Sequence, residues 1–432
     1  MLELIDMTKA WVISVNMGYG HQRTAFPLNN LAFGGKIINA NDYPGMPNSD
    51  RMAWETSRRF YEFISRLQNA PLIGNFFFSL YDRFQKIFSF YPKRDLERPT
   101  FGLKQIYSLL KRGWGKDLIA KLKIQSTKSK TCLPIITTFF ASAFMAEFFN
   151  YPGDIFCAVC DTDISRTWAP LIPQESRIKY FAPTERVAER LRAYGVKEEN
   201  IFLTGYPLPE FSKDDLKQRI LNLDPQKKYF EKYKVLIEKS LGQLPEKSGR
   251  PLTILFSVGG AGAQKEIGVK IIKSLKEKIK KGEVKIILSA GIRKKVREYL
   301  EKEISAEIGS LPAGVEVLYQ EKIEDYFREF NRKLRETDVL WTKPSELSFY
   351  AALGIPIIIA PPVGSQEEFN KRWLLKSGFG FLQENPKYAD QWLFDWLNHG
   401  YLAEAAMQGF IEGEKLGTSN IKKIISEAKS SI

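Results

Sequence analysis

One stretch, residues 338–370, constrains the fold of this 432-residue chain more than any other. Its sequence, DVLWTKPSELSFYAALGIPIIIAPPVGSQEEFN, predicts a strand end, a turn, a short helix and a second strand. Pro344 is placed to open the helix, and Gly354 is placed to end it. Ile355–Ala360 is a continuous apolar run rich in β-branched residues, which is typical of a strand buried on both faces of a parallel sheet. The stretch therefore predicts an α/β fold class.

Polar residues follow both predicted strands of this stretch. In an open α/β sheet, ligands collect outside the carboxyl ends of the strands, where helix N-termini favour phosphate. The turn after Trp341 and the predicted helix start after Ser365 therefore form a candidate nucleotide site. Its candidate residues are Thr342, Lys343, Ser345, Glu346, Gln366, Glu367 and Asn370.

Two glycine-rich turns each follow the first predicted strand of an α/β half. The strand at 10–16 runs into Gly18, Gly20 and His21, and the strand at 252–258 runs into a second turn. Two such turns in one chain predict two facing Rossmann-like domains with a cleft between them. Backbone amides of the second turn can contact a diphosphate. The candidate glycines of that turn are Gly259, Gly260 and Gly262.

The composition predicts where the two domains begin and end. Residues 1–207 form the first domain, and residues 251–415 form the second. Residues 208–250 are charged and helical, which indicates an insertion or linker. Residues 416–432 are interpreted as a C-terminal helix that can cross back onto the first domain.

The charge balance indicates an anionic partner. The chain has 64 Lys and Arg residues against 50 Asp and Glu residues, which is a net charge of +14. A nucleotide, a membrane surface or a nucleic acid would fit this excess. No nucleic-acid-binding motif is recognisable, so no nucleic acid partner is predicted. Residues 270–303 carry many of the basic residues and are interpreted as solvated helix faces.

Cysteine and histidine are too sparse for a metal site. Cys157 and Cys160 form a C-x-x-C, but the chain has no second pair and only two histidines, His21 and His399. Because the run around them reads as a buried strand, we interpret these two cysteines as core thiols, and no metal is predicted. Three cysteines and no visible signal peptide predict a cytoplasmic protein.

Residues 51–95 predict an amphipathic helical hairpin. Apolar and aromatic residues form two helical stripes, and Arg58, Arg59, Arg83 and Lys86 lie on the other faces. Such a hairpin can lie on an anionic membrane or hold a lipid tail, which would place the protein peripherally on the inner membrane face. The alternative is a pair of helices packed on the sheet.

Taken together, the motifs resemble GT-B glycosyltransferases, most closely family 28, which contains the monogalactosyldiacylglycerol synthases. The segments 343–345, 354–356 and 366–370 resemble the family's donor-binding turn, its Gly-Leu-Pro and its Gly-Gln-Glu run. The turn at 18–21 resembles the family's Gly-x-Gly-His turn, and residues 179–207 resemble the series that ends its first domain. Ser345 and Glu346 stand where the family has two glycines, so its ribose-contacting Glu has no clear counterpart.

The resemblance implies an inverting transfer of a hexose from a UDP-sugar to a lipid or another hydroxyl acceptor. It implies no metal or other cofactor, with the UDP-sugar as donor substrate. The first domain would bind the acceptor, and the second would bind the donor. Asp163 or His21 would be the catalytic base, because Thr162-Asp163 follows a predicted strand as in the family, although the family's loop His is missing.

Two alternatives stay open at the sequence level. The chain can be a UDP-sugar epimerase of the same architecture, which would convert its sugar without an acceptor. It can also be a nucleotide-sugar-binding protein that has lost catalysis, since the family's Glu and loop His are missing.

Overall fold

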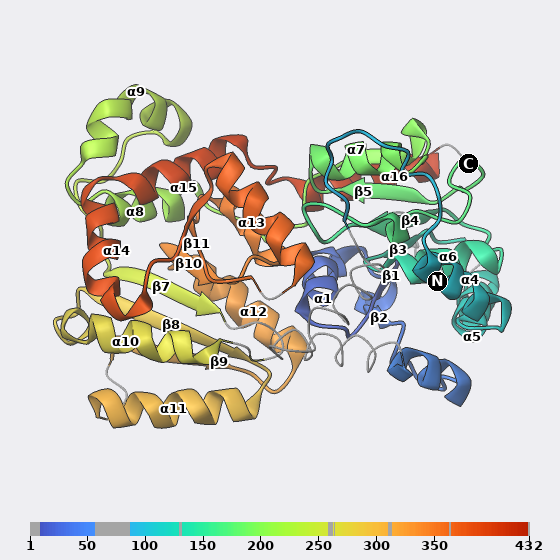
Figure 1. The fold of residues 1–432 in the computed structure, drawn as a ribbon, viewed down its shortest axis with the longest axis horizontal. Coiled ribbons are helices and arrows are strands. Elements are labelled where there is room, and N and C mark those ends of the chain that lie inside the picture. The colour runs from blue at the N-terminus through green and yellow to red at the C-terminus, as the bar shows by residue number, and fades with distance from the viewer. Residues whose placement is uncertain are drawn as a thin grey trace, which may run out of the picture. The chain divides into compact units, whose positions relative to one another are not determined.

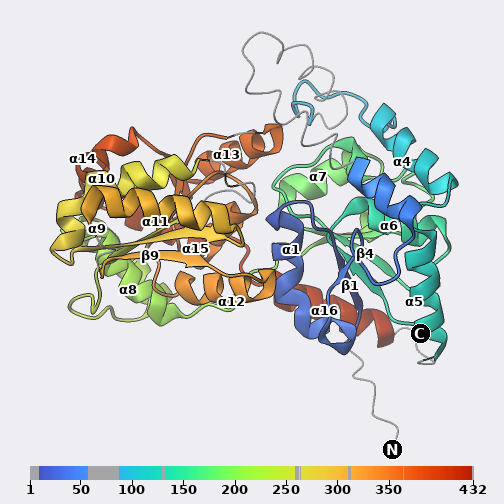
Figure 2. The ribbon, with the colours of Figure 1, turned by 90° about the horizontal axis from the view of Figure 1, so that it is seen from below.

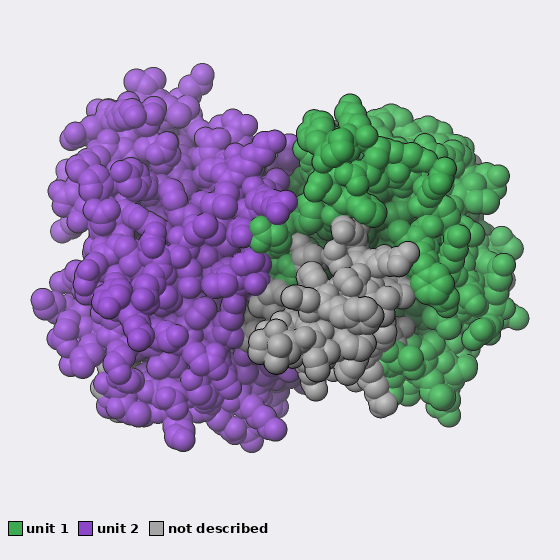
Figure 3. Space-filling view, viewed as in Figure 1, with its two compact units in different colours: residues 1–208, 364–369, 416–432 green, residues 209–363, 370–415 purple. Residues whose placement is uncertain are grey.

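The computed structural model describes residues 9–56, 87–128, 132–257, 262, 264–309, 313–362 and 364–430. The chain divides into two compact units, which are coloured separately in Figure 3. Unit 1 contains residues 1–208, 364–369 and 416–432, and unit 2 contains residues 209–363 and 370–415.

Unit 1 is built on a six-stranded sheet in the order β2-β1-β3-β4-β5-β6. Every neighbouring pair is parallel. The residues of β1, β3 and β4 are buried along their whole length, as expected of strands covered on both faces. The strands are β1 (Trp11–Ser14), β2 (Ile38–Asn39), β3 (Ile135–Thr137), β4 (Ile155–Ala158), β5 (Lys179–Ala182) and β6 (Ile201–Leu203).

Helices cover both faces of this sheet (Figures 1 and 2). The last helix, α16, joins the core of unit 1 because Ile421 and Ile425, one turn apart, pack with Val12 and Phe181. Its Asn420 side chain also donates to the Thr204 carbonyl at 2.8 Å. The helices of unit 1 are α1 (Tyr19–Ala25), η1 (Phe26–Leu31), η2 (Phe33–Gly35), α4 (Phe101–Lys111), α5 (Lys116–Lys128), α6 (Phe140–Phe148), η3 (Arg166–Trp168), α7 (Glu185–Ala193), η4 (Glu198–Asn200) and α16 (Gly417–Ser430).

Unit 2 is built on a second six-stranded parallel sheet, in the order β12-β11-β10-β7-β8-β9. Read from the opposite edge and numbered within the unit, this order is 3-2-1-4-5-6, that of dinucleotide-binding Rossmann folds. The strands are β7 (Leu252–Ser257), β8 (Val284–Gly291), β9 (Val315–Tyr319), β10 (Val339–Thr342), β11 (Ile357–Ile359) and β12 (Gly380–Leu382).

Residues 208–250 form helices whose apolar side chains belong to the core of unit 2, among them Leu216, Ile220 and Ile237. The other helices of the unit flank the sheet on both faces (Figures 1 and 2). The helices are α8 (Lys213–Leu223), α9 (Lys228–Leu241), α10 (Lys265–Lys280), α11 (Lys294–Ile308), α12 (Ile323–Leu334), η5 (Glu346–Leu353), α13 (Ser365–Ser377), η6 (Pro386–Tyr388), α14 (Ala389–Asn398) and α15 (Tyr401–Glu412).

Residues 338–370 have the predicted order of elements, but the helix begins two residues later than predicted. Pro344 does not open the helix, because η5 begins at Glu346 and Ser345 is its N-cap, whose hydroxyl accepts from the Leu347 amide at 3.5 Å. Gly354 ends the helix as predicted, in the left-handed conformation at φ 70°. Each unit is a Rossmann-like α/β domain, and the predicted α/β class with two such domains is confirmed.

Candidate functional site

The strand order in the sheet of unit 2 reverses between β7 and β10. The chain adds β8 and β9 on one side of β7, and then adds β10, β11 and β12 on the other side. At such a switch point the loops at the carboxyl ends diverge and leave a crevice in which ligands bind. The Thr342 hydroxyl, at the end of β10, donates to the Ser257 carbonyl at the end of β7 over 3.2 Å. The candidate residues of the two turns, at 259–262 and at 342–346, therefore follow the two strands that border the switch point, whereas Gln366, Glu367 and Asn370 follow β11.

Side-chain hydrogen bonds tie together the loops around this switch point. The Gln264 amide, after β7, donates to the Pro361 carbonyl, after β11, at 2.7 Å. The Asn370 amide, in α13, donates to the Pro344 carbonyl, after β10, at 3.4 Å. Each bond crosses between chain segments that follow different strands. The loops after β7, β10 and β11 are therefore connected to one another by hydrogen bonds.

The backbone just before α10 adopts the left-handed conformation at two positions. Gly262 lies at φ 75°, and a β-carbon there would be 2.7 Å from Cγ2 of Val296, so only glycine fits. Gln264, the N-cap of α10, is also left-handed at φ 67°, and its side chain does not cap the helix. The first-turn amides of α10, which normally need a cap, can therefore serve an anion.

We expect Gln264→Ala to weaken nucleotide binding by about two- to tenfold, since an exposed loop hydrogen bond of roughly 0.5–1.4 kcal/mol is lost. The measurement is the melting-temperature shift caused by UDP. Gln264→Gly is the control: it also loses the amide but adopts the left-handed conformation without steric cost. It should be no less stable than Gln264→Ala and should lose the same part of the shift. A full UDP shift in both variants would contradict the positioning role of the amide.

Two predicted nucleotide contacts are buried and already hydrogen-bonded within the protein. Thr342 and Asn370 are each only 1% exposed, and their polar groups are used by Ser257 and Pro344. A direct contact of either side chain with a ligand is therefore disfavoured. Among the remaining predicted residues, Lys343, Ser345 and Glu346 are half-buried around the start of η5, and Gln366 and Glu367 lie in the first turn of α13. Gly259 and Gly260 lie outside the described residues.

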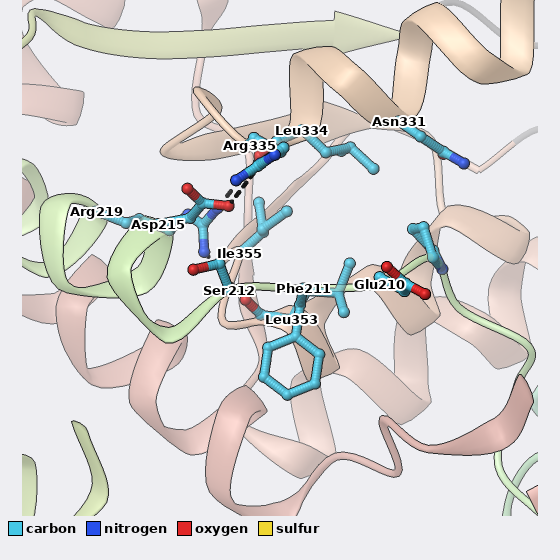
Figure 4. Close-up of a pocket in the computed structure, with 11 residues that line it drawn as sticks. Glu210, Phe211, Ser212, Asp215, Arg219, Asn331, Leu334, Arg335, Leu353 and Ile355 are labelled. Carbon is cyan, nitrogen blue, oxygen red and sulfur yellow. Dashed lines mark hydrogen bonds and ion pairs between the residues drawn. The ribbon is translucent and has the colours of Figure 1, made fainter. Parts of the chain in front are cut away.

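A surface hollow of unit 2 is lined by residues that precede β10 and β11, near the amino ends of these strands (Figure 4). Its wall includes Leu353 and Ile355, which precede β11, and the exposed ion pair of Arg335 with Asp215 at 3.1 Å. Arg219 lies beneath it and donates to backbone carbonyls, including those of Thr337 and Leu353. Burial lowers the pKa of Arg219 to about 10. Arg219 thus satisfies backbone carbonyls at the ends of secondary-structure elements. We therefore interpret the residues around this hollow as stabilising the fold, and we do not assign the hollow to nucleotide binding.

His21 lies at the corresponding switch point of unit 1. The sheet reverses between β1 and β3, and His21, in α1 after β1, lies 2.7 Å through Nδ1 from the carbonyl of Thr138, after β3. A carbonyl only accepts hydrogen bonds, so Nδ1 carries the proton and Nε2 of the neutral imidazole carries the lone pair. Gly18, the N-cap of α1, lies at φ 89°, and Gly20 lies inside that helix. The glycine turn thus presents a histidine with a defined tautomer.

Aromatic rings and a thiol surround this histidine. The Phe139 ring meets His21 edge-on at 5.0 Å between centroids, and Trp168 lies at 6.4 Å. Cys160 Sγ is 3.4 Å from Nδ1 of His21. Cys160 and Cys157 are buried thiols as predicted, and burial raises the pKa of Cys157. The mostly apolar surroundings restrict the orientation of the imidazole.

Asp163, the other predicted base, is engaged in a buried ion pair. Its oxygens accept from Nε and Nη2 of Arg190 at 2.8 and 3.1 Å, and one also accepts from the Ile164 amide at 2.9 Å. Asp163 is 6% exposed and Arg190 is fully buried. Burial raises the pKa of Asp163, and the Arg190 guanidinium opposes that shift. A carboxylate held by three donors cannot easily reach a substrate proton, so the geometry favours His21 as the base.

The structure describes only part of the predicted hairpin at 51–95, because residues 57–86 lie outside the described ranges. Arg58, Arg59, Arg83 and Lys86 fall among them. On either side, Met52 and Tyr91 are strongly exposed, whereas Trp54 packs edge-on against Trp114 at 4.7 Å. No helix in the described part of the chain is long and apolar enough to cross a membrane.

Metal-ligating residues do not cluster in the described ranges. Within them, no group of three or more His, Cys, Asp or Glu side chains is arranged to hold a metal ion.

Comparisons with known proteins find one matching family model and several curated relatives. A family model described as a domain of unknown function (DUF6938) matches residues 245–313, which include β7 and β8. The processive diacylglycerol beta-glucosyltransferase of Staphylococcus carnosus is 24% identical over 253 residues, 57% of this chain and 54% of that protein. The chain therefore spans about half the length of the curated relatives it matches.

Solved structures of similar proteins span both units. The Acinetobacter baumannii MurG structure covers 97% of this chain and 99% of its own, at 13% identity and a TM-score of 0.48. The UDP-GlcNAc 2-epimerase of Neisseria meningitidis, bound to UDP-GlcNAc, covers 83% of this chain and 88% of its own, at 15% identity and a TM-score of 0.44.

Proposed function

We propose that this chain is a glycosyltransferase that transfers a hexose from a UDP-sugar to a hydroxyl group of a lipid or a similar acceptor. The observation that carries the proposal is the switch point of unit 2, where hydrogen bonds of Gln264, Thr342 and Asn370 hold the surrounding segments in register. The relatives named diacylglycerol beta-glucosyltransferases support the reaction type and a lipid acceptor.

In the proposed reaction, unit 2 holds the donor. The diphosphate lies at Gly262 and the first turn of α10, where backbone amides and the helix dipole meet negative charge. These groups stabilise the UDP that leaves, because its charge grows as the glycosidic bond breaks. We propose that this stabilisation needs no metal ion.

Unit 1 activates the acceptor. The acceptor oxygen forms a bond to the anomeric carbon while the bond to the diphosphate oxygen breaks, and the hydroxyl proton passes to Nε2 of His21. Displacement from the opposite face inverts the anomeric carbon, so an α-linked donor gives a β-linked product. The hydrogen bond to Thr138 keeps the lone pair of the imidazole on Nε2 before the reaction.

Transfer assays test the proposal directly. The protein is incubated with UDP-glucose or another UDP-hexose and diacylglycerol in mixed micelles, and products are identified by mass spectrometry. We expect UDP and a β-linked glycolipid to appear together. Conversion of the UDP-sugar in the absence of acceptor would favour the epimerase alternative instead. Nucleotide binding without turnover of any UDP-sugar would favour a non-catalytic binding protein.

We further propose that residues 51–95 bring the protein to anionic lipid. Reversal of Arg58, Arg59, Arg83 and Lys86 to Glu is expected to reduce sedimentation with anionic liposomes at low salt. Wild type should also be released at high salt, because screening weakens surface attraction.

A matched control separates this docking from net charge. It reverses four exposed lysines of unit 2, Lys228, Lys270, Lys281 and Lys302, so the change in charge is the same. The control should still sediment with the liposomes. Equal loss in both variants would mean that total charge, and not the hairpin, drives binding.

A further inference from the structure

Three neighbouring strands of the unit 1 sheet bring three groups together around His21. β3 lies between β1 and β4, and all three strands are parallel. His21 follows β1, Thr138 follows β3, and Cys160 follows β4. The carboxyl ends of parallel strands meet at the same edge of a sheet. The Thr138 carbonyl and the Cys160 thiol therefore both reach Nδ1 of His21, at 2.7 and 3.4 Å.

The sheet holds both of these neighbours of the imidazole in place. The Thr138 amide donates to the Ile13 carbonyl of β1 at 3.0 Å. The Val159 amide, next to Cys160, donates to the Phe181 carbonyl of β5 at 3.1 Å. Cys160 is only 5% exposed, so its side chain has little room to turn away. Because groups held by strands are placed more precisely than groups on loops, the thiol is a fixed partner of the imidazole.

The contacts of the Cys160 thiol define what it offers to His21. Nδ1 of His21 carries a proton, which it donates to the Thr138 carbonyl, so this nitrogen has no lone pair that could accept from the thiol. The thiol proton has another acceptor, because Sγ lies 3.9 Å from Oδ2 of Asp161. The sulfur therefore meets Nδ1 as a second, weaker acceptor, and the Nδ1 proton is shared between an oxygen and a sulfur.

These two acceptors favour one state of the imidazole. A neutral imidazole carries its proton on Nδ1 or on Nε2, and only the first state leaves the lone pair on Nε2. The second state would turn a lone pair of Nδ1 toward the Thr138 carbonyl oxygen and toward a sulfur whose proton is engaged by Asp161. A flipped ring would lose both contacts, because a ring carbon would take the place of Nδ1. The oxygen and the sulfur thus act in the same direction.

We propose that Cys160 is a positioning residue that, together with the Thr138 carbonyl, holds the imidazole of His21 protonated on Nδ1. The inference rests on the proposed function, in which Nε2 takes the proton of the acceptor hydroxyl. The thiol acts through His21 and takes no proton from the acceptor itself. Cys160 therefore differs in role from Cys157, the core thiol of the same strand.

Cys160→Ala and Cys160→Ser test the inference by NMR of protein that contains isotopically labelled histidine. Only His21 and His399 contribute ring signals, and His399→Gln identifies those of the second residue. Correlations between ring protons and ring nitrogens distinguish the two tautomers. We expect His21 to be protonated on Nδ1 in the wild type. In Cys160→Ala its nitrogen shifts should move toward those of the other tautomer, whereas Cys160→Ser, whose hydroxyl also accepts, should stay close to the wild type.

Glycosyl transfer gives a second measurement for the same variants. Cys160→Ala is expected to lower kcat by about three- to tenfold, the effect of losing one weak hydrogen bond that orients the base. KM for the UDP-sugar should stay unchanged, because the proposed diphosphate site lies in unit 2. Cys160→Ser should recover most of the rate. A thiol that only fills space would not be replaced by a hydroxyl in this way.

Cys157→Ala is the matched control, because it removes a fully buried thiol from the same strand. Its His21 signals and its kcat should match those of the wild type. Unchanged His21 signals in Cys160→Ala, or an equal change in Cys157→Ala, would overturn the role of Cys160. A wild-type protein without transfer activity would overturn the proposed function, whereas the histidine spectra would still decide whether Cys160 holds the tautomer.

Discussion

His21→Gln is expected to lower the rate of glycosyl transfer by about 10²–10⁴-fold, the usual effect of losing a general base. Glutamine preserves much of the side-chain volume and can still donate to the Thr138 carbonyl that now accepts from Nδ1. It cannot accept a proton near neutral pH, so the acceptor hydroxyl stays a poor nucleophile. UDP binding, measured by the melting-temperature shift, should stay unchanged because the proposed diphosphate site at Gly262 and the start of α10 lies in unit 2.

The second histidine of the chain provides the control. His399 caps the end of α14, where Nδ1 lies 2.8 Å from the Asp395 carbonyl, and it is exposed. His399→Gln should therefore transfer sugar at the wild-type rate. If His21→Gln also keeps the full rate, the base must be another group, and Asp161, which follows β4 beside Cys160, becomes the next residue to test.

Asp163→Asn is expected to lower the free energy of unfolding by about 3–5 kcal/mol, the usual cost of removing one partner of a buried ion pair. The reason is that Arg190, which is fully buried, would lose its counter-charge. Urea denaturation of wild type and variant measures the difference. Because ΔG falls linearly with urea, the shift in midpoint reports it directly.

A half-exposed ion pair of the same unit is the matched control for Asp163. Asp154 pairs with Lys179 at 2.9 Å, and such pairs contribute about 0–1 kcal/mol. Asp154→Asn should therefore change stability little. If Asp163→Asn unfolds like wild type but loses transfer, then Asp163 is the base after all, and His21 has a positioning role.

The two experiments distinguish a catalytic role from a stabilising role for two residues that follow strands of the unit 1 sheet. His21 and Asp163 both follow strands of unit 1, and both satisfy the sequence criterion for a base. They differ in what surrounds them: His21 bonds through Nδ1 to a backbone carbonyl, whereas Asp163 is neutralised by Arg190. The expected readouts differ accordingly, a rate for the first residue and a stability for the second.

Local sequence was enough to predict the elements of this protein and its fold class. Apolar β-branched runs such as Ile357–Ile359 form buried strands because only a strand covered on both faces can bury every residue. Gly354 ends η5 as predicted, since glycine adopts φ 70° without steric cost. The sequence also indicated the turn before His21, because glycine favours turns, and Gly18 there adopts φ 89°. These properties depend on a residue and its near neighbours in the chain.

Long-range pairing decided which of the predicted residues could act together. Thr342 and Ser257 meet although 85 residues separate them, because β10 pairs with β7 and not with β9. The sequence predicts Asp163 as a candidate base, and the fold brings it into an ion pair with Arg190, 27 residues further along the chain. A sequence pattern reports the local conformational preference of a segment. The strand order decides which residues pair with a buried charge and which loops lie next to each other. That order is determined by the packing of the core across the whole sheet.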